Sequence, residues 1–278
     1  MDSSPYAVLA RVYDLQHYLL TADLPMYERL ARDLAPDQPI LEIGCGTGRV
    51  LIPLAQAGLD IVGIDNSPEM LAIAQQRLAA QPLAAPPTLP ASSPSAQLVL
   101  ADALTYVSER RFGLAFIALN TFLHNLSQSA QLQTLRAARA NLADSGTLVV
   151  DLPPNDELAN QPDDGEFEFE ASIIESGSQT QIEKFVSSRV FWATQEQELS
   201  YRMLERDPNR KSDGDAAPIK TTEVTFRLRH VFKHEMELLL QQTGFAAPRW
   251  YGDYDLSDYT NESPRMIAVA RVVNVASV

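Results

Sequence analysis

Residues 40–50 read ILEIGCGTGRV, an apolar run followed by three glycines at alternate positions, Gly44, Gly46 and Gly48. A glycine inside a regular element costs roughly 0.5–1 kcal/mol relative to alanine, so three within five residues need a geometric reason. A ligand that packs directly against the main chain is one such reason. A strand, a glycine-rich turn and a helix in this order predict a nucleotide-like ligand at the carboxyl end of a parallel sheet.

The segments around this loop alternate between strand-like and helix-like patterns, which is typical of a parallel sheet with helices on its faces. Ser67 is placed to cap a helix whose first position is Pro68. Five prolines make residues 81–95 an exposed irregular connection. We expect strands at 39–44, 60–65, 96–102, 112–119 and 146–153, and helices at 50–58, 67–80 and 128–143.

From about residue 156 to 232 the apolar residues recur with period two, which indicates an antiparallel sheet. Its clearest strands are 184–192, 197–204 and 221–232, and the polar stretch 207–218 is expected to be a long hairpin loop. A helix at 233–244 and strands at 248–254 and 265–273 follow. In strand 221–232 we expect a buried face of Val224, Phe226, Leu228, His230 and Phe232, and an exposed face of Glu223, Thr225, Arg227 and Arg229.

Composition limits the classes of partner. Lys and Arg number 22 against 36 Asp and Glu, and the net charge of −14 argues against a nucleic acid as the main partner. The N-terminus lacks a signal-peptide pattern, and no apolar run approaches the roughly 18 residues that a membrane span needs. The single cysteine, Cys45, excludes an internal disulfide and a cysteine-built metal site. We expect a cytoplasmic protein with neither a nucleic acid nor a membrane as partner.

Two classes of ligand compete for the glycine loop. The dinucleotide fingerprint G-x-G-x-x-G needs a third glycine at position 49, where this chain has Arg49. The loop instead reads E-x-G-x-G-x-G from Glu42 to Gly48, and this resembles the first motif of the class I S-adenosylmethionine-dependent methyltransferases. The stretches YGDYD at 251–255, SPRMI at 263–267 and the N-terminal stretch 13–31 are similar to bacterial members of that family.

The resemblance implies S-adenosylmethionine as the cofactor. It implies that Asp65 accepts hydrogen bonds from the ribose hydroxyls, that Asp102 faces the adenine, and that Cys45 donates its backbone N–H to the methionine part. The cofactor-binding residues implied are Glu42, Gly44, Cys45, Gly46, Gly48, Asp65, Asn66, Met70, Asp102, Ala103, Leu119 and Asn120.

The resemblance also implies the fold class, α/β with a Rossmann-like, doubly wound, mostly parallel seven-stranded sheet and an inserted antiparallel β cap. The cofactor-binding domain is expected to comprise residues 1–155 and 233–278. Residues 156–232 are expected to form the cap, which looks like the insert that small-molecule methyltransferases carry beside the acceptor pocket.

His124, just after the fourth strand, is the candidate base, because an imidazole near its reference pKa of about 6.5 accepts a proton at neutral pH. The competing interpretation is a helix-terminal histidine bonded to backbone. Tyr13 is a second candidate, either as a lid residue that touches cofactor or acceptor, or as an aromatic that packs an N-terminal helix. His17, His230 and His234 show no metal-ligand spacing, and no metal is expected.

The predicted function is S-adenosylmethionine-dependent methyl transfer to a nitrogen or oxygen atom of a small molecule, by a monomer or homodimer. The alternative is a non-catalytic sensor or binding protein for S-adenosylmethionine or S-adenosylhomocysteine. The arginines of the cap strands are expected on a solvated face, where they could meet an anionic acceptor: Arg189, Arg202, Arg227 and Arg229.

Overall fold

The computed structural model describes residues 10, 13, 20–80, 96–154, 156–160, 162–175, 180–206 and 218–273. The irregular connection predicted at 81–95 and nearly all of the hairpin loop predicted at 207–218 lie outside the described residues. The chain divides into two compact units, and each is described by itself below. The larger unit comprises described residues of 20–155 and 231–278, and the smaller comprises those of 156–230 together with Ala10 and Tyr13.

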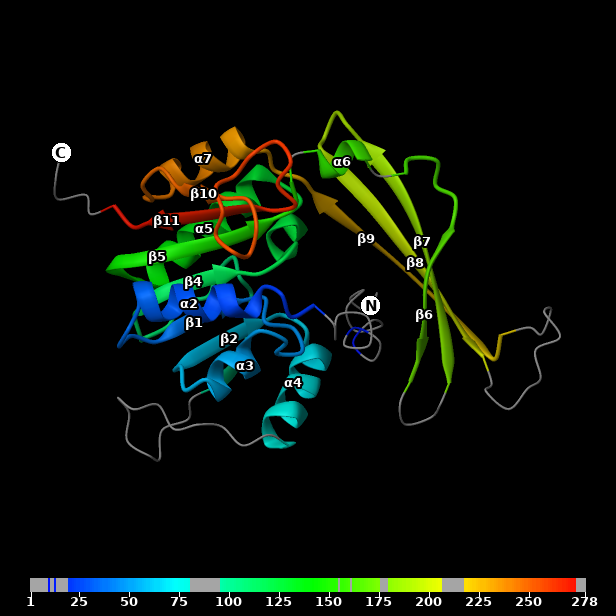
Figure 1. Ribbon diagram of the computed structural model, residues 1–278, viewed down its shortest axis with the longest axis horizontal. Coiled ribbons are helices and arrows are strands. Elements are labelled where there is room, and N and C mark those ends of the chain that lie inside the picture. Colours follow the sequence, from blue (N-terminus) through cyan, green and yellow to red (C-terminus); the bar gives the residue numbers. More distant parts are fainter. Residues whose placement is uncertain are drawn as a thin grey trace. The chain divides into compact units, whose positions relative to one another are not determined.

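A seven-stranded sheet runs through the larger unit in the order β10-β11-β5-β4-β1-β2-β3 (Figure 1). Its parallel part consists of β5 (Leu142–Leu152), β4 (Phe112–Ile117), β1 (Ile40–Ile43), β2 (Ile61–Asp65) and β3 (Ala96–Leu100). β11 (Met266–Arg271) runs antiparallel to β5, and β10 (Arg249–Tyr251) runs antiparallel to β11. The predicted Rossmann-like, mostly parallel seven-stranded sheet is confirmed.

The helices between these strands begin at the signals that the sequence carries. Ser67 Oγ accepts the Met70 N–H at the start of α4 (Pro68–Ala80), and Ser127 Oγ accepts the Ala130 N–H at the start of α5 (Gln128–Asn141). α2 (Leu24–Leu34) packs against α3 (Leu51–Gln56), and α5 packs against α7 (Lys233–Gln242). A short 3₁₀ helix, η1 (Thr121–His124), follows β4.

The two central strands of the sheet are fully buried. Every residue of β1 and β4 is buried, and the Phe116 ring of β4 stacks on Tyr27 of α2 with centroids 4.5 Å apart. β1 lies between β2 and β4, so the strand order reverses there. In open α/β sheets the crevice that binds ligands lies at such a reversal, here beyond the carboxyl ends of β1 and β4. The turns that follow β1, β2, β3 and β4 therefore all meet at one edge of the sheet.

The smaller unit contains a four-stranded antiparallel sheet in the order β6-β7-β8-β9, and the helix α6 (Glu157–Asn160). The strands are β6 (Glu168–Ile174), β7 (Gln181–Phe191), β8 (Glu196–Arg206) and β9 (Lys220–Arg229). Three of them cover the predicted segments. β6 is an additional edge strand, with mostly exposed residues, that the sequence pattern did not predict.

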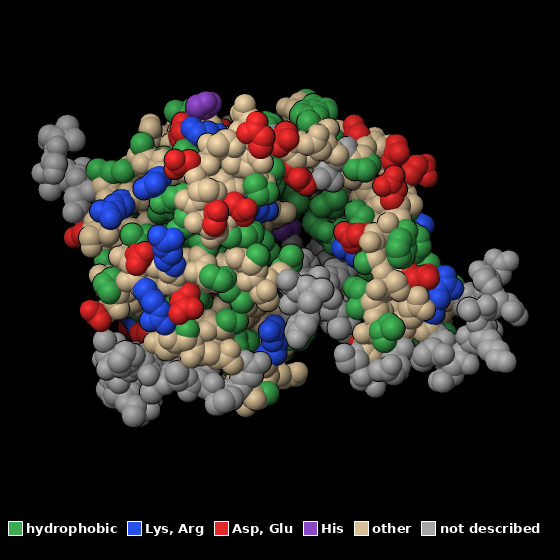
Figure 2. All heavy atoms as spheres, viewed as in Figure 1, with side chains coloured by type: hydrophobic (Ala, Val, Ile, Leu, Met, Phe, Trp, Pro, Cys, Tyr) green, Lys and Arg blue, Asp and Glu red, His purple; other side chains and the backbone are tan. Residues whose placement is uncertain are grey.

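The predicted alternation of residues 223–232 is followed in part, and β9 ends at Arg229. Phe226 and Phe232, predicted to be buried, are half-buried. Val224, Leu228 and His230 are buried, and Arg227 is exposed. Arg229, expected on the exposed face, is buried because its guanidinium turns to donate to Gln195 Oε1 at 3.2 Å. Half-buried Arg202 and exposed Arg227 pair with glutamates on neighbouring strands. Figure 2 shows Lys and Arg side chains mixed with Asp and Glu over the visible surface.

Candidate functional site

The glycine loop is hydrogen-bonded to the last two residues of β2. Gly44, Gly46 and Gly48 all have left-handed backbone angles, with φ of +77°, +53° and +80°. The N–H groups of Gly44 and Cys45 both donate to the Ile64 carbonyl, at 2.8 and 2.9 Å. A Cβ on Gly44 would lie 2.3 Å from Thr121 Cγ2, so this glycine lets the loop after β1 touch the turn after β4.

Gly46 differs from its two neighbours in what surrounds it. A Cβ built on Gly46 would meet no atom of the described residues within 4 Å, whereas one on Gly48 would lie 2.9 Å from Ile52 Cδ1. The backbone at Gly46 therefore faces open space at the crevice. Bare main chain that faces an open crevice suits a ligand that packs on the backbone itself.

Asp65, at the end of β2, holds the glycine loop in this shape. Its Oδ2 accepts the Gly46 N–H at 2.8 Å, and its Oδ1 accepts the Ser67 N–H at 2.8 Å. Burial raises the pKa of this carboxyl, while these backbone donors lower it. Each carboxylate oxygen can accept a second hydrogen bond, so Asp65 retains the capacity to accept hydroxyl donors from a ligand.

Glu42 lies within β1, and its carboxyl is buried. Burial raises the pKa of Glu42 well above its usual range, while the charge of Arg49 and a hydrogen bond from the Leu51 backbone lower it. Its Oε2 has no hydrogen-bond partner among the described residues. A buried polar atom without a partner is costly, and a donor from a bound ligand would relieve that cost.

The turns after β3 and β4 complete this edge. Asp102 is exposed; its Oδ1 accepts the Leu104 N–H at 2.9 Å. Leu119 and Asn120 follow β4, with Asn120 exposed at the start of η1. Among the other predicted cofactor residues, Asn66 is exposed, Ala103 is half-buried and Met70 is buried.

His124 ends η1 and is half-buried. Burial lowers its pKa to about 4, well below the value near 6.5 expected from the sequence. The imidazole is therefore neutral at pH 7 and able to accept a hydrogen bond, but it is a weaker base than an exposed histidine.

Two predicted residues lie in different surroundings from those expected. Cys45 was expected to donate its backbone N–H to the cofactor, but that N–H is bonded to Ile64, and its thiol is buried against Gly63. Tyr13 groups with the smaller unit, where burial, then Glu170 and then Tyr13 raise the pKa of Tyr201. The role of Tyr13 as a lid residue stays a prediction.

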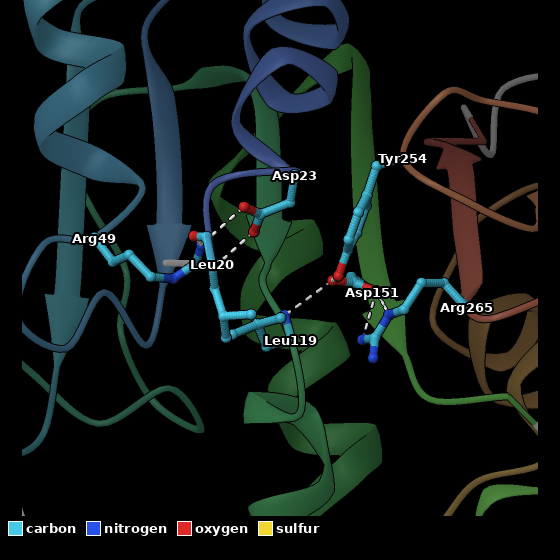
Figure 3. Close-up of polar contacts among 7 residues, drawn as sticks. All are labelled: Leu20, Asp23, Arg49, Leu119, Asp151, Tyr254 and Arg265. Atoms are coloured by element: carbon cyan, nitrogen blue, oxygen red, sulfur yellow. Dashed lines mark hydrogen bonds and ion pairs between the residues drawn. The ribbon is translucent and has the colours of Figure 1, made fainter. Parts of the chain in front are cut away.

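A buried ion pair joins the glycine loop to the start of α2. Arg49, which follows Gly48, donates from Nη1 and Nη2 to the two carboxylate oxygens of Asp23 at 2.7 and 2.6 Å, and from Nη1 to the Leu20 carbonyl at 2.6 Å (Figure 3). In the sequence, Arg49 was noted only because it stands where the dinucleotide fingerprint needs a glycine. Its partner lies 26 residues away, so no local pattern could reveal the pair.

Asp151 is another buried carboxylate. It lies near the end of β5, one residue beyond the last residue that pairs with β4. It contacts Arg265, Tyr254 and the N–H of Leu119 (Figure 3). Sequence reasoning did not single out this residue. An acid directly after a run of buried apolar residues, as in LVVDL at 148–152, is the signal that was available.

The described residues contain no group of three or more His, Cys, Asp or Glu side chains that could hold a metal ion. Within the same part of the chain, none of the helices combines the length and apolar character of a membrane span. The predicted site residues on strands β1 to β4 and the turns after them include the carboxyls of Glu42, Asp65 and Asp102 and the imidazole of His124. This set fits a ligand with hydroxyl and amino groups, as S-adenosylmethionine has.

Comparison with known proteins finds a matching family profile for part of the chain. Residues 40–146 match the family profile described as a methyltransferase domain. A carboxy-S-adenosyl-L-methionine synthase of Methylococcus capsulatus is 31% identical over 145 residues, which are 48% of this chain and 55% of that protein. The chain therefore spans about half the length of this curated relative.

Two solved structures share the fold over nearly the whole chain. The CcbJ methyltransferase of Streptomyces caelestis has a TM-score of 0.76 and 23% identity, covering 99% of this chain and 100% of that one. CalS10 of Micromonospora echinaspora, an amino pentose methyltransferase with S-adenosylmethionine bound, has a TM-score of 0.69 and 19% identity, covering 98% of each. Residues 40–146 thus match a methyltransferase domain by sequence, and the chain shares its fold with two solved methyltransferases.

Proposed function

We propose that this chain transfers a methyl group from S-adenosylmethionine to a nitrogen or oxygen atom of a small molecule. The observation that carries the proposal is the open, left-handed backbone at Gly46, tied to the Asp65 carboxylate at the crevice of the sheet. When bound, S-adenosylmethionine supplies a methyl group that is already activated by its sulfonium sulfur.

In this proposal the chain's own residues bind and orient. Asp65 accepts the ribose hydroxyls with its remaining lone pairs, and Asp102 accepts the adenine amino group with the oxygen that does not cap its own turn. Glu42 Oε2 accepts a donor that it lacks within the described chain. Holding two reactants in line supplies most of the rate enhancement that such a reaction needs.

His124 remains the proposed proton acceptor, and its lowered pKa makes the proposal more specific. An alkylammonium, with a reference pKa of about 10.4, would not give its proton to an imidazole of pKa about 4. A hydroxyl oxygen that is gaining a methyl group becomes far more acidic and would. A role for His124 as base therefore goes with an oxygen acceptor, whereas a nitrogen acceptor must bind as the neutral amine.

Two observations support a small molecule as the acceptor. The net charge of −14 disfavours a nucleic acid. The structurally similar CalS10 is named as an amino pentose methyltransferase, so amino sugars are a reasonable first class to test.

The test begins with calorimetric titration of S-adenosylmethionine and of S-adenosylhomocysteine. Protein and methyl-labelled S-adenosylmethionine are then incubated with pools of amino sugars and of hydroxylated metabolites, and products are found by mass spectrometry. We expect binding and a labelled product. Absence of binding would refute the proposal, and tight binding without transfer across broad pools would favour a sensor.

A further inference from the structure

The turn after β4 contains a backbone conformation that needs support. Leu119 has a φ of +52°, in the left-handed region that side chains other than glycine rarely adopt. Leu119 lies between the end of β4 and η1, at the edge of the sheet where the glycine loop also lies. Strained residues at such an edge persist only where their surroundings fix them.

The side chain of Asp151 binds the backbone of Leu119. The Leu119 N–H donates to Asp151 Oδ2 at 3.2 Å, and the Tyr254 hydroxyl donates to the same oxygen at 3.3 Å (Figure 3). Arg265 donates from Nε to the other oxygen, Oδ1, at 2.8 Å, and its Nη2 lies 2.7 Å from that oxygen. The carboxylate is fully buried, so water cannot replace these partners.

Arg265 favours the ionised form of this carboxylate, against the effect of its burial. Burial raises the pKa of Asp151, while the charge and the hydrogen bond of Arg265 lower it. Oδ2 of the carboxylate accepts from the Leu119 N–H and the Tyr254 hydroxyl, and Oδ1 accepts from Arg265.

The turn that Leu119 opens carries residues of the proposed site. It leads to Thr121, whose methyl group lies directly against Gly44, and to His124 at the end of η1. A displacement of this turn would therefore move the candidate base and one wall of the glycine loop together.

We propose that Asp151 is a positioning residue for methyl transfer, which holds the turn of residues 119–124 in place through the Leu119 amide. Arg265 and Tyr254 fix the orientation of its carboxylate. This inference rests on the proposed function, because it assigns the turn a part in the transfer reaction.

The main test is Asp151→Asn, which keeps the shape of the side chain but removes its charge. The matched control is Asp60→Asn, because Asp60 forms an ion pair with Arg110 at the opposite edge of the same sheet, before β2 and β4. Tyr254→Phe is a milder second variant that removes one hydrogen bond to Asp151 and leaves the ion pair.

The first measurement is amide hydrogen exchange of peptides that span residues 112–127, without any ligand. We expect exchange in the turn to become roughly tenfold faster in Asp151→Asn, less so in Tyr254→Phe, and to stay unchanged in Asp60→Asn. Unchanged exchange in both Asp151→Asn and Tyr254→Phe would overturn the inference, whatever the protein catalyses.

The second measurement is the single-turnover rate of methyl transfer at saturating S-adenosylmethionine, below the unfolding temperature of every variant. We expect Asp151→Asn to lower this rate by about 100-fold, the effect of misplacing a reacting group by about 1 Å, with a much smaller change in cofactor affinity. Asp151→Asn should lower the rate by a smaller factor in a Leu119→Gly background than in the wild type, because glycine adopts this φ without strain.

A purely structural role predicts a lower melting temperature with an unchanged rate, and that result would also overturn the inference. Failure of the wild-type protein to bind S-adenosylmethionine or to transfer methyl is a different outcome. It would refute the proposed function, and the hydrogen exchange would still report whether Asp151 holds the turn.

Discussion

Gly46→Ala, compared with Gly58→Ala, separates the effect of a ligand from the effect of backbone strain. Gly46 and Gly58 have φ of +53° and +82°, and within the part of the chain that the structure describes a Cβ on either would meet no atom within 4 Å. Alanine at either position should therefore cost only the strain of a left-handed backbone, about 1–2 kcal/mol of unfolding free energy.

The two positions differ in their place on the sheet. Gly46 lies in the loop after β1, at the crevice, whereas Gly58 lies before β2, at the opposite edge. A methyl group at Gly46 would occupy space that a ligand on the backbone needs, and such overpacking costs about 1–3 kcal/mol. We expect the affinity for S-adenosylmethionine to fall roughly 10- to 100-fold in Gly46→Ala and to stay unchanged in Gly58→Ala.

Urea unfolding gives the two stabilities, and calorimetry gives the two dissociation constants. The reasoning would be refuted by a folded Gly46→Ala variant that binds S-adenosylmethionine as tightly as the wild type. It would equally be refuted by a Gly58→Ala variant that loses the same affinity, because strain alone would then explain the loss.

Three other predictions test the site. Asp65→Ala should weaken S-adenosylmethionine binding by about 1.5–3 kcal/mol, because the ribose hydroxyls lose a charged acceptor; calorimetry that finds unchanged affinity in a folded variant would contradict this role. NAD should give no thermal shift, since Arg49 stands at the third fingerprint position and is held by Asp23; a clear stabilisation by NAD would reverse the choice of ligand. Because the folded pKa of His124 is about 4 and the unfolded pKa about 6.5, the unfolded chain takes up the proton first as pH falls. Between pH 7 and pH 5, His124 should therefore lower the unfolding free energy by about 2 kcal/mol, and urea unfolding of His124→Gln at both pH values should show that much less loss than the wild type.

The parts of the fold that the sequence predicted are those with local signals. The strand, the glycine loop and the next helix follow one another within residues 40–56, and Ser67 and Pro68 mark a helix start by their chemistry alone. The role of Asp65 was implied by the resemblance to the methyltransferase family, and its place as the last residue of β2 agrees with the strand predicted at 60–65.

The remaining errors arise where distant contacts decide. β6 reads EFEASII and is mostly exposed, so it lacks the apolar alternation by which a strand is found in a sequence. Arg229 is buried because Gln195, on the turn before β8, offers it an acceptor. Asp151 and Arg265 are 114 residues apart, and no pattern within either segment announces their pairing.

The position of β11 has a consequence for synthesis of the chain. β11 pairs with β5 along its whole length, from Met266 with Leu152 to Arg271 with Thr147, yet more than a hundred residues separate the two strands. At about 5–20 residues per second, the ribosome leaves this edge of β5 unpaired for roughly 6–23 s after the strand has been made. An unpaired edge of buried apolar residues is an aggregation hazard, so nascent or truncated chains that end before residue 266 should need a chaperone to stay dispersed.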